Sequence, residues 1–153
     1  MNSTAFDESK VIDSPVGWVA DHIKDYVETD GRKGHFHLSL KAETLLLTVQ
    51  GRKSGNWHRT ALAYQLDGEN YVVAASSGGT PKHPTWYLNL SKNPEVHVQV
   101  LADKFTARAR VAEGEGEERA RLWNKLVEFS SDYDRFQAMS GRETPVVVLE
   151  PVR

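Results

Sequence analysis

The order of apolar and polar positions along the chain predicts short strands with helices between them. Residues 14–28 repeat apolar side chains at helical spacing, which is typical of an amphipathic helix on a core. Ser14 and Pro15 at the beginning of this stretch indicate the start of a helix, because serine is a common N-cap residue and proline suits the first turn. The expected apolar face consists of Val16, Val19, Ile23, Tyr26 and Val27. We therefore predict a packing helix over 14–28.

Most of the remaining chain shows apolar residues in short runs or in alternation with polar ones, as strands do. These stretches are 44–50, 59–66, 71–75, 95–101, 104–111 and 144–151. The dipeptide Asp67-Gly68 separates two of them, which predicts a hairpin turn.

Three further helices are expected among these strands. One begins at Pro84 and stops before Asn93-Pro94, and another covers 113–129 with acidic residues at its start, which suits the helix dipole. A short third helix contains Tyr133 and Phe136. Since strands and helices do not alternate regularly, we predict an α+β fold, an antiparallel barrel with inserted and flanking helices. Residues 1–13 are expected to be a polar tail and 14–153 a single domain.

Composition narrows the classes of function. The net charge of -2 over 153 residues argues against a nucleic-acid surface. No cysteine occurs, which excludes disulfides, thiolate metal sites and a cysteine nucleophile and fits a cytosolic protein. No apolar run approaches the ~18 residues of a membrane helix, and residues 1–14 lack the basic start and apolar centre of a signal peptide.

The strongest local signal is the loop that contains Ser76, Ser77, Gly78 and Gly79. Glycines leave backbone N–H groups open to an anion, and the helix that starts near Pro84 adds the positive end of its dipole. Lys82 lies beside them. On these residues alone, the loop is therefore either an anion-binding site or an ordinary strand-to-helix connector.

A basic turn, with Arg52, Lys53 and Arg59, lies between two predicted strands. Arginine grips phosphate with two hydrogen bonds and lysine acts as a mobile charge. Together with the loop at 76–79, the turn suggests a phosphorylated ligand, whereas the alternative is a charged hairpin tip in solvent. Trp57, Trp86 and Tyr87 fit equally well as core aromatics.

Other catalytic motifs are absent. Ser76 and Ser77 do not lie in a G-x-S-x-G elbow, which argues against a serine hydrolase. His35 and His37 have strand-like spacing, but a third zinc ligand cannot be named, so a surface pair is favoured and no metal is expected. The order of residues in GRKSG excludes a P-loop, and G-x-G-x-x-G does not occur.

Four ordered motifs carry a resemblance to a known family. They are GRKSG, ASxGG, HPxWYxNLxxNPxV and TPVVVLEP. Over residues 15 to 151 the chain resembles the deazaflavin-dependent nitroreductase family, which uses coenzyme F420. The resemblance implies a split β-barrel related to FMN-binding oxidoreductases. It also implies hydride transfer from the reduced cofactor to a small electron-poor acceptor, such as a quinone, an enone or a nitroaromatic, and a cytoplasmic or membrane-peripheral actinobacterial setting.

The same resemblance implies roles for individual residues. Cofactor contacts are expected from Arg52, Lys53, Arg59, Ala75, Ser76, Ser77, Gly78, Gly79, Lys82 and Trp86. Tyr133 is expected to cap the substrate face as the catalytic proton donor, with Phe136 beside it as a second substrate-binding residue. Departures from the family pattern are Phe136 in place of a second tyrosine, Ser77 in place of a basic residue and Ala61 in place of proline.

Two other functions remain open at this level. One is an FMN-dependent reductase on the same fold, and the other is a non-catalytic protein that binds or carries F420. Titration with both cofactors, followed by turnover of a quinone or an enone, separates the three. The oligomeric state is not determined by the sequence.

Overall fold

The computed structural model describes residues 6–38, 40–76, 79–112 and 116–152. Its helices are the 3-10 turn η1 (Glu8–Lys10), α1 (Gly17–Thr29), α2 (Thr85–Lys92), α3 (Glu117–Phe129) and α4 (Asp132–Ser140). Its strands are β1 (Ile12–Asp13), β2 (Phe36–His37), β3 (Ala42–Gln50), β4 (Trp57–Ala63), β5 (Gln65–Asp67), β6 (Asn70–Ala74), β7 (Glu95–Val100), β8 (Asp103–Ala112) and β9 (Val146–Pro151). The α+β class is confirmed.

One curved sheet organises the molecule. Its strand order is β1-β4-β3-β7-β8-β9-β6-β5, with β2 paired to β3. All pairings are antiparallel except the one between β1 and β4. Strands β4 and β5 lie toward opposite ends of this order although Tyr64 alone separates them in the chain, so the sheet curls back on itself. The expected barrel is not closed, because no ladder among the described strands joins these two ends.

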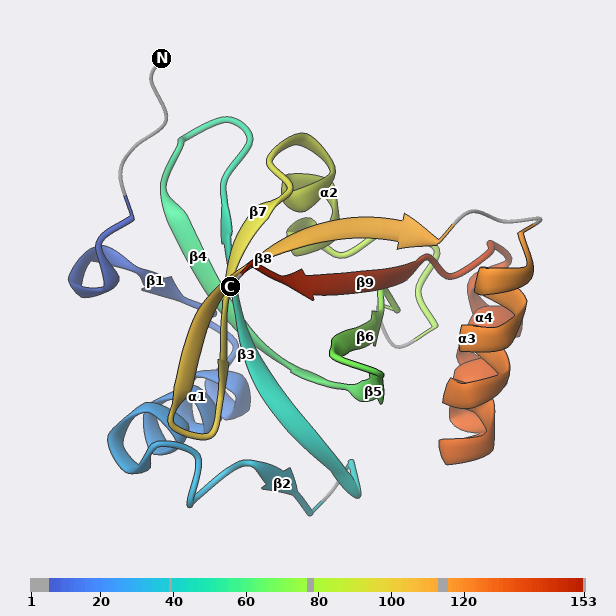
Figure 1. Ribbon diagram of the computed structural model, residues 1–153, viewed down its shortest axis with the longest axis horizontal. Helices are drawn as coiled ribbons and strands as arrows, with labels where there is room; N and C mark the ends of the chain where they lie inside the picture. The colour runs from blue at the N-terminus through green and yellow to red at the C-terminus, as the bar shows by residue number, and fades with distance from the viewer. Residues whose placement is uncertain (1–5, 39, 77–78, 113–115, 153) are drawn as a thin grey trace.

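The core lies on both surfaces of this sheet because side chains alternate along each strand. Leu45, Leu47 and Val49 of β3 point into the main core, whereas Leu46 packs against α1 on the other side. Figure 1 shows α1 at one end of the molecule and α3 beside α4 at another. Leu122 and Leu126 of α3 pack on strands β6 and β9. The helices therefore cover separate parts of the sheet and leave room between them.

Helix α1 begins later than its sequence signals predict. Val16 is the N-cap residue, and it is 51% exposed rather than part of the packed face. Ser14 donates its backbone N–H to the carbonyl oxygen of Arg59 at 3.0 Å, so the chain is still tied to β4 at that point. Helix α2 likewise starts at Thr85, with Pro84 as its N-cap. The other predicted members of the α1 face pack as expected.

The described part of the predicted polar tail, residues 6–13, contacts the sheet. Phe6 stacks on His97 with ring centroids 3.7 Å apart and meets Trp57 edge-on. Glu8 pairs with Lys104 at 3.0 Å, and β1 adds a short parallel strand beside β4. This segment is therefore packed against the sheet.

The strand expected at 59–66 also differs. It is two strands, β4 and β5, that bend at Tyr64. The hairpin predicted at Asp67-Gly68 is present, since Asp67 pairs with Asn70 and Gly68 adopts φ 61°. A positive φ at this position is the reason that glycine suits the turn.

Candidate functional site

Of the three pockets described below, the largest lies between α1, β4 and α4 and has a volume of about 590 Å³. Its walls combine small and aromatic side chains. The small residues are Ala42, Ala61, Ala63, Ala74 and Ser76, and the aromatic residues are Trp18, Phe129, Tyr133 and Phe136. Small side chains leave space and aromatic rings offer flat apolar surfaces, so the pocket suits a planar ring system.

Tyr133 and Phe136 reach this pocket from the same side of α4. The ring of Tyr133 packs near that of Trp123, edge-on at 6.4 Å. Burial raises the pKa of the Tyr133 hydroxyl, because a charged phenolate is disfavoured away from water. The hydroxyl therefore stays protonated near neutral pH and can act as a hydrogen-bond donor in the pocket.

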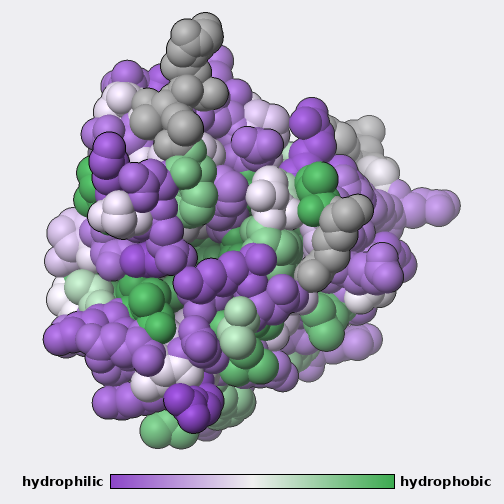
Figure 2. Space-filling view, turned by 60° about the vertical axis from the view of Figure 1, so that its left-hand side comes forward, coloured by the Kyte–Doolittle hydropathy of each residue, from purple (hydrophilic) through white to green (hydrophobic). Residues whose placement is uncertain are grey.

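A second pocket of about 350 Å³ adjoins the first along β4. Residues 58–60 of β4 line the second pocket, and residues 61–63 line the first. Trp86 and Arg59, both predicted cofactor residues, lie together in this second pocket. The face seen in Figure 2 is largely polar, with some apolar side chains in a central hollow and others at the outer surface.

The basic turn lies at the edge of the second pocket. Arg52 donates its backbone N–H and its guanidinium to Oδ1 of Asn89, at 3.2 and 2.8 Å, and Asn89 lines the pocket. Lys53 is exposed beside it. The structure thus places Arg52, Arg59 and Trp86 near one pocket, although Arg59 already forms an ion pair with Asp13 at 2.6 Å.

The loop at 75–82 follows β6 and meets the end of α4. Ser76 lines the larger pocket, whereas Ala75 is buried and Lys82 is exposed. Gly79 adopts φ 89°, and a Cβ there would lie 3.1 Å from Cβ of Met139. The positive φ favours glycine at 79, and the nearby Met139 side chain leaves little room for a Cβ. The predicted cofactor residues Ser77 and Gly78 lie outside the described part of the chain.

Sequence reasoning missed Arg142, which holds both ends of this loop. Its Nη2 donates to the carbonyl oxygens of Ala75 and Lys82, at 3.4 and 3.0 Å. Its Nε and Nη1 are buried without a hydrogen-bond partner. The pKa of His83 is lowered, first by burial and then by the charge of Arg142. In the sequence, Arg142 lies in no motif and is simply an arginine that precedes the last strand, so no local signal marks it as a site residue.

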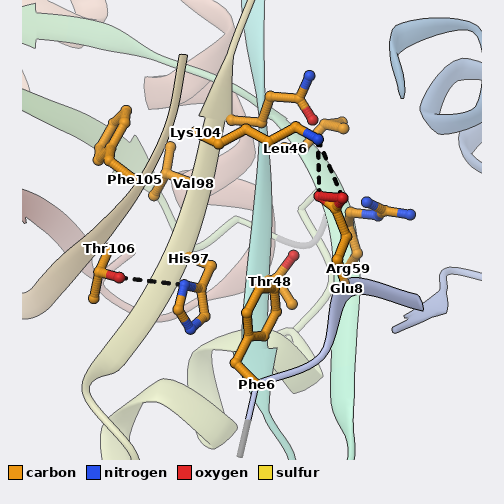
Figure 3. A pocket seen from close by; sticks show the side chains of 11 residues that line it. Phe6, Glu8, Leu46, Thr48, Arg59, His97, Val98, Lys104, Phe105 and Thr106 are labelled. Carbon is orange, nitrogen blue, oxygen red and sulfur yellow. Dashed lines mark hydrogen bonds and ion pairs between the residues drawn. The ribbon is translucent and has the colours of Figure 1, made fainter. Parts of the chain in front are cut away.

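A third pocket, of about 220 Å³, lies under the amino-terminal segment. Figure 3 shows Phe6 over this pocket, the ion pair between Glu8 and Lys104, and the hydrogen bond between Thr106 and His97. Arg59 lines both this pocket and the second one. The amino-terminal segment therefore helps to form the walls of two pockets.

Within the described residues, no three histidine, aspartate or glutamate side chains are grouped as metal ligands. His35 instead pairs with Glu43 at 2.9 Å, and Nδ1 of His37 accepts the backbone N–H of Leu40. No described helix combines the length and the apolar character that a membrane crossing requires.

Comparisons with known proteins agree on one family. Residues 18–151 match the F420H(2)-dependent quinone reductase family. A Mycobacterium tuberculosis protein described as an F420H(2)-dependent quinone reductase is 36% identical over 129 residues, which are 84% of this chain and 86% of that protein.

Two solved structures are similar to this chain, and one of them is described by its dependence on F420. A structure described as an F420-H2 dependent reductase is 37% identical, with a TM-score of 0.64, over 70% of this chain and 93% of its own. A structure described as a domain-swapped dimer is 33% identical, with a TM-score of 0.67, over 90% of this chain and 100% of its own. The dependence on F420 suggested by the four motifs is thus confirmed at the level of the family. The family is described by quinone reduction, whereas the motifs led to the nitroreductase name.

Proposed function

Because this chain belongs to the F420H(2)-dependent quinone reductase family, we propose that it reduces a quinone with a hydride from reduced coenzyme F420. The observation that supports this most directly is the pair of adjoining pockets along β4. One is lined by small and aromatic side chains that suit flat rings, and the other is bordered by arginines that suit an anionic chain. A split β-barrel and a cytoplasmic location are part of the same proposal.

The chain fits a cofactor that joins a flat ring to a phosphate and an acidic tail. Arg52, Lys53 and Arg59 supply charge at one end of the double pocket, and Trp86 supplies an aromatic wall. Ser76, with Ala75, Gly79 and Lys82, lies toward the other end. When bound, the reduced deazaflavin supplies the hydride, and the protein supplies position and charge. Ser77 and Gly78 keep their predicted cofactor role as part of this proposal.

Tyr133 has the clearest chemical role in the proposal. Quinone reduction adds one hydride and one proton, and the hydride leaves one carbonyl oxygen of the acceptor as an oxyanion. The protonated hydroxyl of Tyr133 can donate its hydrogen bond or its proton to that oxygen, and the proton is then replaced from water. Phe136 and Phe129 provide apolar surface beside it, which limits the access of water to the reacting groups.

A binding titration followed by turnover tests the proposal. We expect the purified protein to bind oxidised and reduced F420 and to bind FMN poorly, as followed by absorbance and fluorescence. With F420H2 present, a quinone should then be consumed as the reduced cofactor disappears. Equal or tighter FMN binding would favour an FMN-dependent reductase, and F420 binding without turnover of quinones, enones or nitroaromatics would favour a carrier protein.

A further inference from the structure

Arg142 is partly buried, and its guanidinium has no anionic partner among the described residues. Two of its three guanidinium nitrogens have no hydrogen-bond partner. The third donates only to neutral backbone carbonyls, those of Ala75 and Lys82. Adjacent Glu143 does not neutralise it, because the Glu143 carboxylate pairs with Nε of Arg119 at 3.5 Å.

Leaving guanidinium nitrogens buried without hydrogen-bond partners is energetically unfavourable. A buried polar group without a partner loses its hydration and gains nothing in return, and the penalty is larger for a charged group. Proteins leave few groups of this kind, and a missing ligand is one common reason for them.

The two arginines at the second pocket differ from Arg142, which lies outside the residues that line either pocket. Arg59 has the carboxylate of Asp13 as a partner, and Arg52 has the amide oxygen of Asn89. Arg142 alone of these three lacks both a carboxylate and a partner for its Nε and Nη1. The unfilled hydrogen-bonding capacity therefore belongs to a residue that bonds the carbonyl oxygen of Ala75, and Ala75 directly precedes Ser76 of the larger pocket.

We propose that Arg142 binds the phosphate group of the cofactor and at the same time fixes the two ends of the loop. This inference rests on the proposed function, because it takes F420 as the ligand. The Nη2 atom keeps its two bonds to Ala75 and Lys82. A phosphate oxygen accepts from the N–H groups that have no partner, and small rearrangement of their surroundings admits it. The argument uses only the described residues on either side of positions 77 and 78.

The packing of α4 gives this contact a second effect. Met139, in the last turn of α4, packs against Gly79, and Arg142 follows directly after the end of that helix. The same helix carries Tyr133 and Phe136 at the larger pocket. Phosphate binding at Arg142 thus holds the loop that contains Gly79 against α4, the helix that carries Tyr133 and Phe136.

The test compares F420 with a compound that lacks both the phosphate and the acidic tail attached through it. This compound, an 8-hydroxy-5-deazaflavin with a ribityl side chain, keeps the ring and is phosphate-free. Arg142→Met is expected to raise the Kd of F420 at least tenfold and to leave the Kd of the phosphate-free compound within about twofold, as measured by fluorescence titration. Arg142→Lys keeps the charge but loses the planar fork, so a smaller loss is expected.

Controls separate binding from folding. Arg121→Met removes the same charge from α3, where Arg121 forms an exposed ion pair with Asp67 of β5. This variant should leave both Kd values unchanged. Thermal midpoints of the ligand-free proteins check the fold, and if Arg142→Met does not fold, Arg142→Lys carries the same comparison. Unchanged F420 binding, or an equal loss for both ligands, would overturn the role of Arg142. In contrast, a wild-type protein that does not bind F420 would overturn the proposed function itself.

Discussion

Arg59 on β4 and Asp13 on β1 form a bidentate ion pair. Nε of Arg59 lies 2.6 Å from Oδ1 of Asp13, and Nη2 lies 3.3 Å from Oδ2. The parallel pairing of the two strands sets the residues side by side, and the Arg59 side chain is only 12% exposed. A carboxylate of the chain therefore already occupies the arginine that we propose for the acidic tail of the cofactor.

We expect Asp13→Asn to strengthen F420 binding several-fold, because the anionic tail no longer competes with an internal carboxylate for Arg59. The same change should lower the free energy of unfolding by about 1–3 kcal/mol, since Arg59 loses a charged partner in a mostly buried place. Fluorescence titration and chemical denaturation measure the two effects. Asp21→Asn, an equal charge change on the exposed side of α1, is the matched control. Weaker or unchanged binding in Asp13→Asn would mean that Arg59 has only a structural role.

The basic turn allows a second prediction. Arg52→Ala and Lys53→Ala should each weaken F420 binding by about 0.5–1.5 kcal/mol, a modest amount because both side chains are exposed. Higher salt should weaken binding to the wild-type protein and reduce the difference between it and the variants. Isothermal titration at two ionic strengths provides the measurement. Unchanged affinity in both variants would identify the turn as a solvated hairpin tip.

For Tyr133→Phe we expect an F420 affinity within about twofold of the wild type. Turnover should fall at least tenfold, which corresponds to about 1.4 kcal/mol of barrier, because the variant keeps the ring but loses the proton donor. Steady-state rates with a quinone and an enone measure this change. Tyr71→Phe removes a hydroxyl elsewhere, from β6, and serves as the control. Full activity of Tyr133→Phe with both acceptors would leave Tyr133 as a wall residue.

The lowered pKa values of two histidines predict that the free energy of unfolding falls at acidic pH. Burial lowers the pKa of both His22 and His97 below the ordinary value of 6.5, so the unfolded chain binds protons more readily than the folded protein. Their contribution to stability is complete above pH 6.5 and is lost as the pH falls toward the folded-state values. Denaturation curves at pH 7.5 and 5.0 should show this loss, and it should be smaller in His97→Gln. An equal loss in that variant would contradict the assignment to His97.

The sequence predicted those parts of the fold that depend on local patterns. Strands β3, β7, β8 and β9 follow from alternation or apolar runs, and the face of α1 follows from Val19, Ile23 and Tyr26. It did not predict β1, because a two-residue strand has no periodicity and its pairing with β4 depends on residues 46 positions away. That pairing is also the reason that Ser14 does not cap α1.

The candidate site was predictable only in part. The motifs pointed to Arg59, Trp86, Ser76 and Tyr133, which the structure places in two adjoining pockets. Asp13 and Arg142 were missed because each acts through a partner far along the chain, Arg59 in the first case and Ala75 in the second. A charged residue in a loop gives no sign of such a partner. The roles in binding and catalysis that are assigned to the residues of the candidate site remain predictions.

The position of β9 in the sheet has a consequence for how the protein is made. Strand β9 lies between β8 and β6, so among the described strands only β9 pairs the β6-β5 hairpin with the rest of the sheet. On the ribosome, residues 42–112 can pair among themselves, but the edge of β6 that faces away from β5 has no strand to join until residues 146–151 emerge. Chains that stall before that point expose a two-stranded ribbon with an unpaired edge, which is a site where nascent chains aggregate.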